Sequence, residues 1–395
     1  MKKIISIAMI FFAIIFLVAC ETGPTLKLYN WGLYIDDDIV KDFEDETGIR
    51  VKQISFDSNE IAITQIKSGN QYDLVIPSDY AIEQLANENL IDPIDWSRLT
   101  TFSKETDLAD SLSHVLNKLN EGPDGFDMLK YAVPYFWGNV GILYNTNTVD
   151  TDDLETLGWD ALTLSTKYKV AFYNSSREAY LIALKQLEAS SVNHPTEVEF
   201  AAATQWLNQA LTKDTYVITD DIFSAMIERP ARYDLAVSYS GDANYLMQEN
   251  DDLSFFVPDQ GTNVWVDAFV TPKGADLDLA YQFMNFMLTY DSAKRNTEFV
   301  GYSTPRKDVF LDVLGEGETF NGYEASYDVR INENDEVYRH NDTLKLRMDS
   351  SWQEILASKG FDDGGLGTGT IIAIIAVGVL LVSSITVTAI RKRKR

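Results

Sequence analysis

The sequence is poor in the residues on which many enzymes and metal sites depend. It has one cysteine, Cys20, and only three histidines, His114, His194 and His340, which lie far apart along the chain. A single cysteine excludes an intramolecular disulfide and a cysteine-rich metal site. The sequence also lacks a glycine-rich phosphate loop, a motif for an activated nucleophile and an internal repeat. It therefore predicts no cofactor and no resident metal ion.

Basic residues are scarce as well. The chain has 33 Lys and Arg against 60 Asp and Glu, a formal net charge of -27. Leaving out the seven basic residues at the two ends, Lys2, Lys3 and residues 391–395, gives -34 for the remainder. A field of this sign repels nucleic acid and concentrates cations near the surface. We expect no nucleic-acid partner, and a cationic ligand is compatible with the charge.

The N-terminal segment has the layout of a secretory signal peptide, because Lys2 and Lys3 precede an apolar run that ends in small residues. Cys20 follows this run directly and resembles the cysteine of a bacterial lipobox. Residues 1–20 are therefore predicted to be a signal peptide with a lipidation site at Cys20. An uncleaved signal anchor is the alternative.

The C-terminal segment predicts a membrane anchor. Residues 369–390 contain no charge, and five basic residues, 391–395, follow at once. A bilayer core needs roughly 20 apolar residues of helix, and basic residues beside such a helix stay in the cytoplasm. We predict a linker at 361–368, a transmembrane helix at 369–390 and a cytoplasmic tail. The domain before them would then lie on the extracytoplasmic face of the cell membrane.

Residues 21–368 are too many for one simple core and fit two lobes. Short apolar runs alternate with helical patterns, which predicts a parallel α/β layout. The first predicted strands are 26–29, 49–56 and 73–77, and the first helices are 36–47 and 59–67. Ligands of open α/β sheets bind beyond the carboxyl ends of strands. Four polar or aromatic side chains fall there: Trp31, Tyr34, Ser78 and Tyr80.

A stretch near the middle of the chain carries acids beside aromatic residues. A strand-like run at 235–237 breaks near Tyr239 and Asp242, and a second run, 264–270, contains Trp265 and Asp267. Burying an aspartate is costly unless a cation or several donors meet it, and aromatic faces attract organic cations. The pattern favours a site for an organic ammonium ion. It is also compatible with Asp267 capping a loop and Trp265 filling a core.

Other positions allow two interpretations. Ser175 or Ser176 can cap a helix that continues to residue 187, and Glu178 either favours the N-terminus of that helix or points into a cleft. Tyr302, in a predicted loop at 298–305, is expected to face a cleft, whereas Trp206 is assigned to packing. Residues 131–138 are a predicted crossing between lobes, and 306–340 have little periodicity.

Seven segments, in this order, resemble the spermidine/putrescine-binding proteins of bacterial polyamine ABC transporters. They are 28–34, 46–49, 58–60, 72–78, 134–138, 265–267 and 301–305. The resemblance implies a periplasmic-binding-protein type II fold, in which two α/β lobes joined by crossing strands close on a linear polyamine. It implies no enzyme but a receptor that delivers its ligand to an ABC permease and ATPase.

The resemblance also implies boundaries and site residues. The first lobe would comprise 25–133 and 265–303, and the second 134–264 and 304–360. The aromatic walls would be Trp31, Tyr34, Tyr239, Trp265 and Tyr302, the polar contacts Ser78 and Tyr80, and the ammonium-binding carboxylates Glu178, Asp242 and Asp267.

Three positions depart from the family pattern. Ser175 and Leu33 stand where some members have acids, and Tyr338 is the best match to a glutamine of spermidine binders. Fewer acids compensate fewer ammonium groups, so putrescine is favoured, with spermidine next. A receptor of the same fold for a metal or another small solute is the alternative. An adhesin with a vestigial cleft and a glycosidase using Asp242 and Asp267 are more distant ones.

Overall fold

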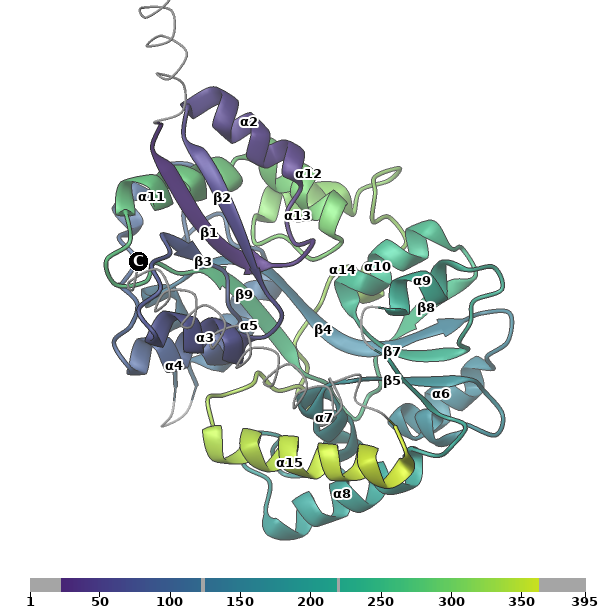
Figure 1. The fold of residues 1–395 in the computed structure, drawn as a ribbon. Coiled ribbons are helices and arrows are strands. Elements are labelled where there is room, and N and C mark those ends of the chain that lie inside the picture. Colours follow the sequence, from purple (N-terminus) through teal and green to yellow (C-terminus); the bar gives the residue numbers. More distant parts are fainter. Residues whose placement is uncertain (1–22, 122–124, 219–220, 362–395) are drawn as a thin grey trace, which may run out of the picture.

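A computed structural model describes residues 23–121, 125–218 and 221–361 (Figure 1). The predicted signal peptide with Cys20, the linker from residue 362 on, the transmembrane run 369–390 and the basic tail lie outside the described residues. Within the described ranges, no helix has both the length and the apolar character that a membrane span requires.

A three-stranded parallel sheet opens the fold, with strand order β2-β1-β3. Its strands are β1 (Thr25–Trp31), β2 (Arg50–Phe56) and β3 (Leu74–Val75), and its first helices are α2 (Asp37–Thr47), α3 (Asn59–Lys67) and α4 (Asp79–Asn87). Gly48, with φ of 71°, ends α2, and the Ser58 hydroxyl accepts a hydrogen bond from Ile61 N at 3.2 Å to cap α3. These predicted boundaries are confirmed, because each rests on a local capping signal.

A long strand, β4 (Val133–Asn145), connects the two halves of the molecule (Figure 1). Its first half pairs with β9 (Val264–Phe269), and its second half pairs with β7 (Leu235–Tyr239) and β8 (Leu253–Phe256). The second sheet has the order β6-β5-β7-β4-β8, in which β5 is Val170–Tyr173 and β6 is Tyr216–Ile218.

The predicted parallel α/β layout does not extend to β4, which is antiparallel to β7, β8 and β9. It holds among β1 to β3 and among β5 to β7. Because β4 is buried on both faces, it has no alternating pattern, and such a run carries no signal of strand direction.

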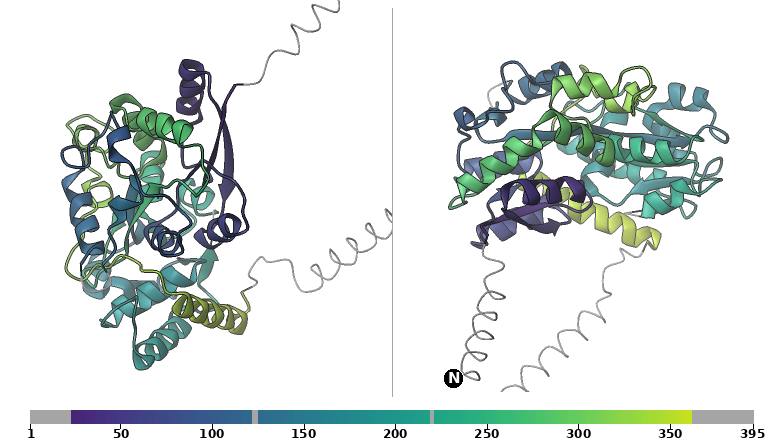
Figure 2. Two further views of the ribbon diagram at one scale, coloured as in Figure 1. Left: turned by 90° about the vertical axis from the view of Figure 1, so that its left-hand side faces the viewer. Right: turned by 90° about the horizontal axis from the view of Figure 1, so that it is seen from above.

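Three helices cover one side of the second sheet. They are α7 (Ser176–Gln186), α8 (Glu197–Ala210) and α15 (Asp342–Lys359), which lie side by side in Figures 1 and 2. A capping box between Thr196 and Glu199 begins α8. Trp206 on this helix is buried, and its indole N–H donates to Asp160 Oδ1 at 2.7 Å. Its assignment to packing is confirmed.

The C-terminal third is more helical than its sequence pattern predicts. The loop expected at 298–305 begins later, because α12 continues to Val300 and ends at Gly301 with φ of 91°. The remaining helices are α5 (Asp110–Leu119), α6 (Thr151–Leu157), α9 (Asp221–Ile227), α10 (Ser240–Glu249), α11 (Leu277–Met287), α12 (Tyr290–Val300), α13 (Lys307–Val313) and α14 (Glu324–Tyr327), with 3-10 turns at Trp96–Arg98, Met128–Lys130 and Gly158–Thr163.

Candidate functional site

Asp267 lies in the middle of β9, with Phe136 of β4 and Ser78 as its bridge partners. The residue is 5% exposed, and its Oδ1 makes no hydrogen bond with the described part of the chain. Burial raises the pKa of Asp267 to about 7, although the hydroxyls of Ser78 and Tyr34 oppose part of the rise. Oδ1 of this carboxyl therefore has no donor among the described residues, and a cationic ligand would provide one.

Aromatic rings surround this carboxylate. The ring of Tyr302 is 5.5 Å from Tyr34 and 5.1 Å from Trp265, and Trp265 is 6.3 Å from Tyr239, all edge to face. These four predicted wall residues thus form a continuous row, and each pair has the geometry in which aromatic rings attract one another.

Tyr302, which the sequence predicts to face a cleft, is buried in this row. A Cβ atom on Gly241 would lie 2.2 Å from Tyr302 Cγ, so only glycine allows this approach. The Tyr302 hydroxyl donates to Asp242 Oδ1 at 2.8 Å, which links this second predicted acid to the row. The close packing of the ring could not be predicted from the local sequence, because the glycine that accommodates it lies far away along the chain.

Glu178 lies in the first turn of α7 and faces inward. It is buried, and the Ser175 hydroxyl donates to its Oε2. Ser175, one of the two predicted positions, is the N-cap residue of α7, but its side chain accepts no hydrogen bond from a backbone N–H. The Ser176 hydroxyl instead donates to Asp349. Burial and then the charge of Glu178 raise the pKa of Tyr239, so the carboxylate and this phenol are neighbours.

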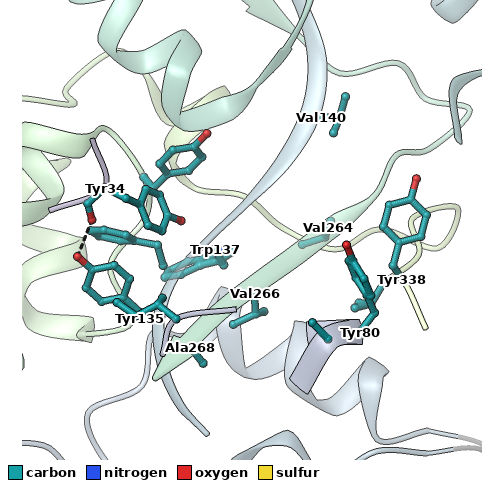
Figure 3. Packing of buried hydrophobic residues seen from close by; sticks show 14 of the residues in the cluster. Tyr34, Tyr80, Tyr135, Trp137, Val140, Val264, Val266, Ala268 and Tyr338 are labelled. Carbon is teal, nitrogen blue, oxygen red and sulfur yellow. Dashed lines mark hydrogen bonds between the residues drawn. The ribbon is translucent and has the colours of Figure 1, made fainter. Parts of the chain in front are cut away.

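Ser78 and Tyr80 are both held by Asn59, whose amide N–H groups donate to the two hydroxyl oxygens at 3.0 Å. The Tyr80 hydroxyl in turn donates to Glu60 Oε1 at 3.3 Å. Figure 3 shows Tyr80 beside Tyr338 and apart from Tyr34. Tyr80 therefore lies at the end of the row that is farther from Tyr34.

Trp31, the remaining predicted wall residue, packs on Phe56 with ring centroids 4.5 Å apart. Its indole N–H has no hydrogen-bond partner among the described residues, and the same is true of Trp265 and of the buried Asn30 amide. Unpaired donors and acceptors inside a protein are uncommon. These unpaired groups are candidates for contact with a ligand or with water.

Two buried residues beside the candidate site were missed by sequence reasoning. Asp79 is fully buried, and its carboxylate accepts hydrogen bonds from Val266 N at 2.9 Å and Tyr80 N at 2.6 Å. Burial raises the pKa of Asp79 to about 8. It fixes α4 against β9 and so positions the neighbouring Asp267. Arg177 is the second, and only its place directly before Glu178 hinted at a role.

The arrangement defines a class of protein. Two α/β halves share the central strand β4, which pairs with β9 in one half and with β7 in the other (Figure 1). Acids and aromatic rings from both halves contact one another, as the Tyr302–Asp242 hydrogen bond and the Trp265–Tyr239 ring contact show. Residues 38–319 match the family described as bacterial extracellular solute-binding protein, and the chain belongs to this family. The expectation of a binding protein rather than an enzyme is confirmed, which removes the glycosidase interpretation.

Two individual relatives show which members of this family the chain is similar to. The chain is 29% identical over 289 residues to the spermidine/putrescine-binding periplasmic protein of Escherichia coli K12, covering 72% of this chain and 78% of that protein. It is 28% identical over 304 residues to the putrescine-binding periplasmic protein of the same organism, with the same coverage.

A solved structure is similar to this chain as well. The spermidine/putrescine ABC transporter substrate-binding protein of Streptococcus pneumoniae aligns with a TM-score of 0.68 and 30% identity, covering 85% of this chain and 100% of that one. The predicted resemblance to the polyamine-binding proteins is confirmed.

Proposed function

We propose that this protein is an extracytoplasmic receptor that binds a linear polyamine, putrescine before spermidine, and delivers it to an ABC permease and its ATPase. The observation that carries the proposal is the buried Asp267 carboxylate, whose Oδ1 has no donor among the described residues and which lies beside Tyr34. A primary ammonium supplies the missing donor and charge, and its methylene chain suits the adjoining rings.

A diamine needs a counter-ion for each of its two ammonium groups, and the three acids along the row can provide them. Asp267 and Asp242 lie near Tyr302, whereas Glu178 lies beyond Tyr239. One ammonium group would be bound near Tyr302 and the other at Glu178, with Trp265 against the chain between them. Trp31 and Ser78 would complete the walls.

The expected hydrogen-bond and cation–π energies are adequate for binding such a ligand. Micromolar affinity corresponds to about -8 kcal/mol. Hydrogen bonds to charged groups contribute roughly 1.5–3 kcal/mol each, and cation–π contacts about 0.5–2 kcal/mol. Three of the former and three of the latter together amount to roughly 6–15 kcal/mol, a range that includes the required value before the cost of association is subtracted.

The membrane setting is proposed from sequence alone. Lipidation at Cys20 and a helix at 369–390 would hold the receptor beside its permease at the outer face of the membrane. The predicted lobe boundaries are also part of the proposal.

Isothermal titration calorimetry with putrescine, spermidine and ferric citrate tests the function. We expect heat with the two amines and none with the iron compound. Binding of ferric citrate alone would favour the metal-receptor alternative, although the described residues contain no group of three or more His, Cys, Asp or Glu side chains placed to hold a metal ion. No heat with either amine would refute the proposal.

A further inference from the structure

A largely buried ion pair joins α4 to the segment that precedes α15. Arg339 donates two hydrogen bonds to Glu83, from Nη2 to Oε1 at 2.7 Å and from Nε to Oε2 at 3.0 Å. The backbone N–H of His340 donates to the same Oε2 at 3.0 Å. The Glu83 side chain is 12% exposed and that of Arg339 is 17% exposed. Two parallel hydrogen bonds between a guanidinium and a carboxylate add both energy and geometric specificity to an ion pair.

The segment that carries Arg339 is attached to the second half of the molecule. Lys185 of α7 donates to Glu336 Oε1 at 2.7 Å, three residues before Arg339. Asn193 lies in the connection between α7 and α8, where its Oδ1 accepts from Arg339 N at 2.8 Å and its Nδ2 donates to the Val337 carbonyl oxygen at 2.9 Å. Because α7 and α8 cover the second sheet and α15 begins shortly after this segment, Arg339 moves with the second half.

Glu83 belongs to the first half, because α4 follows β3 along the chain and packs against β9. The ion pair also adjoins one end of the candidate site. Tyr80 lies one turn before Glu83 on α4, and Tyr338 directly precedes Arg339. These two rings contact each other edge to face, with centroids 6.5 Å apart, as Figure 3 shows. The Arg177 guanidinium lies 3.9 Å from the Tyr80 centroid and 5.5 Å from that of Tyr338. Both halves therefore build this end of the site.

Two other ion pairs across this junction are longer and more exposed. Glu60 Oε1 of α3 is 3.4 Å from Arg177 Nη2 and 3.9 Å from Lys345 Nζ, and the Glu60 side chain is 43% exposed. Exposed ion pairs contribute little to stability, whereas removing one partner of a buried pair leaves an uncompensated charge and is costly. Of these three ion pairs, Glu83 with Arg339 therefore does most to hold the two halves together.

We propose that the Glu83–Arg339 pair is a latch that keeps the two halves closed over the bound ligand and so sets the residence time of the ligand. This inference rests on the proposed function, in which the halves separate to admit and release a polyamine. Separation at this junction breaks the pair, whereas the pair is absent when the ligand first enters an open cleft. Losing one partner of a buried, hydrogen-bonded pair acts mainly on dissociation. Loss of the latch should therefore speed release and leave association nearly unchanged.

The rate of ligand release tests the latch on the full chain. Chasing bound radiolabelled putrescine with excess unlabelled putrescine gives the dissociation rate constant, and dividing it by the calorimetric Kd gives the association rate constant. In Arg339→Met, dissociation should be at least tenfold faster, with the association rate constant within threefold of the parent. Glu83→Gln should speed dissociation at least threefold, because its amide keeps one acceptor oxygen. The double variant should match Arg339→Met within twofold, since the pair is already broken. Parental dissociation rates in both single variants would overturn the proposal.

Arg347→Met is the matched control. Arg347 also donates two hydrogen bonds to a carboxylate, from Nη1 and Nη2 to the two oxygens of Glu197 at 2.7 Å each. Both of these residues lie in the second half, on α15 and α8, so their pair does not break when the halves separate. The dissociation rate constant of Arg347→Met should stay within twofold of the parent. Equally fast release from Arg347→Met and Arg339→Met would contradict the latch, because it would indicate a general loosening of the second half.

The outcomes separate this inference from the function on which it rests. If the parent binds putrescine and the variants release it at the parental rate, the latch fails and the receptor function stands. If the parent binds no amine, the proposed function fails, and spin labels at the exposed positions Ile61 of α3 and Leu346 of α15 decide whether the pair closes the halves. The distance between the labels should then be longer in Arg339→Met than in the parent, and equal distances would overturn the latch. If circular dichroism shows that Arg339→Met is unfolded, Glu83→Gln decides in its place.

Discussion

Substituting Asp267 by asparagine should weaken putrescine binding and remove its pH dependence. The change keeps the size of the side chain but removes the charge that one ammonium group would pair with. A hydrogen bond to a charged group contributes roughly 1.5–3 kcal/mol, and about 1.4 kcal/mol corresponds to tenfold. We therefore expect a loss of affinity of about 10- to 150-fold for Asp267→Asn.

The pH dependence follows from the pKa of about 7 for Asp267. Only the ionised carboxylate pairs with an ammonium, so its fraction rises from about one tenth at pH 6 to about nine tenths at pH 8. The parent should bind putrescine about tenfold more tightly at pH 8 than at pH 6. In Asp267→Asn this increase should disappear, because the remaining amide does not titrate.

As the pH rises, the stability of the ligand-free protein should fall, whereas the affinity for putrescine rises. A carboxyl whose pKa is raised above its usual 3.8 keeps its proton in the folded state. Between about pH 4 and pH 7 the folded state thus binds more protons than the unfolded state, and the free energy of unfolding falls as the pH rises. Between pH 5 and pH 8, the melting temperature should fall less for Asp267→Asn than for the parent.

Calorimetry at pH 6, 7 and 8 and constant ionic strength measures the binding. Asp335→Asn is the control, because that buried carboxylate accepts from Thr262 N at 2.8 Å and Asn332 N at 2.7 Å and serves the fold. It should lower the melting temperature and leave the affinity and its pH dependence unchanged. Parent-like affinity for Asp267→Asn, or an equal pH dependence in both proteins, would refute the role of Asp267.

Three further substitutions test the row and the core. Tyr302→Phe removes the hydrogen bond to Asp242 and should weaken putrescine binding about 3- to 10-fold by calorimetry; unchanged affinity would exclude a role for this contact. Gly241→Ala places a Cβ against the Tyr302 ring and should cost at least tenfold in affinity while circular dichroism stays native; tight binding would contradict the packing argument. Trp206→Phe loses the bond to Asp160 and should lower the free energy of unfolding by about 1–3 kcal/mol in urea, with affinity retained. Weakened binding at unchanged stability would reverse that assignment.

Local signals in the sequence were sufficient for much of the fold. Gly48 and Ser58 mark a helix end and a helix start without help from distant residues. The direction of β4 was inaccessible, because its partners β7, β8 and β9 lie far along the chain and its burial on both faces leaves no periodicity. Tertiary pairing decides such strands.

The candidate site shows the same difference between residues marked by local signals and residues matched by distant contacts. Asp267 and Trp265 were detectable because an acid and an indole stand out within an apolar run. Asp79 was missed because its role comes from a contact with Val266 N, and Arg177 because its ring partners come from two separate segments. A sequence pattern identifies a residue that is unusual for its neighbours, but not a residue that is ordinary locally and matched at a distance.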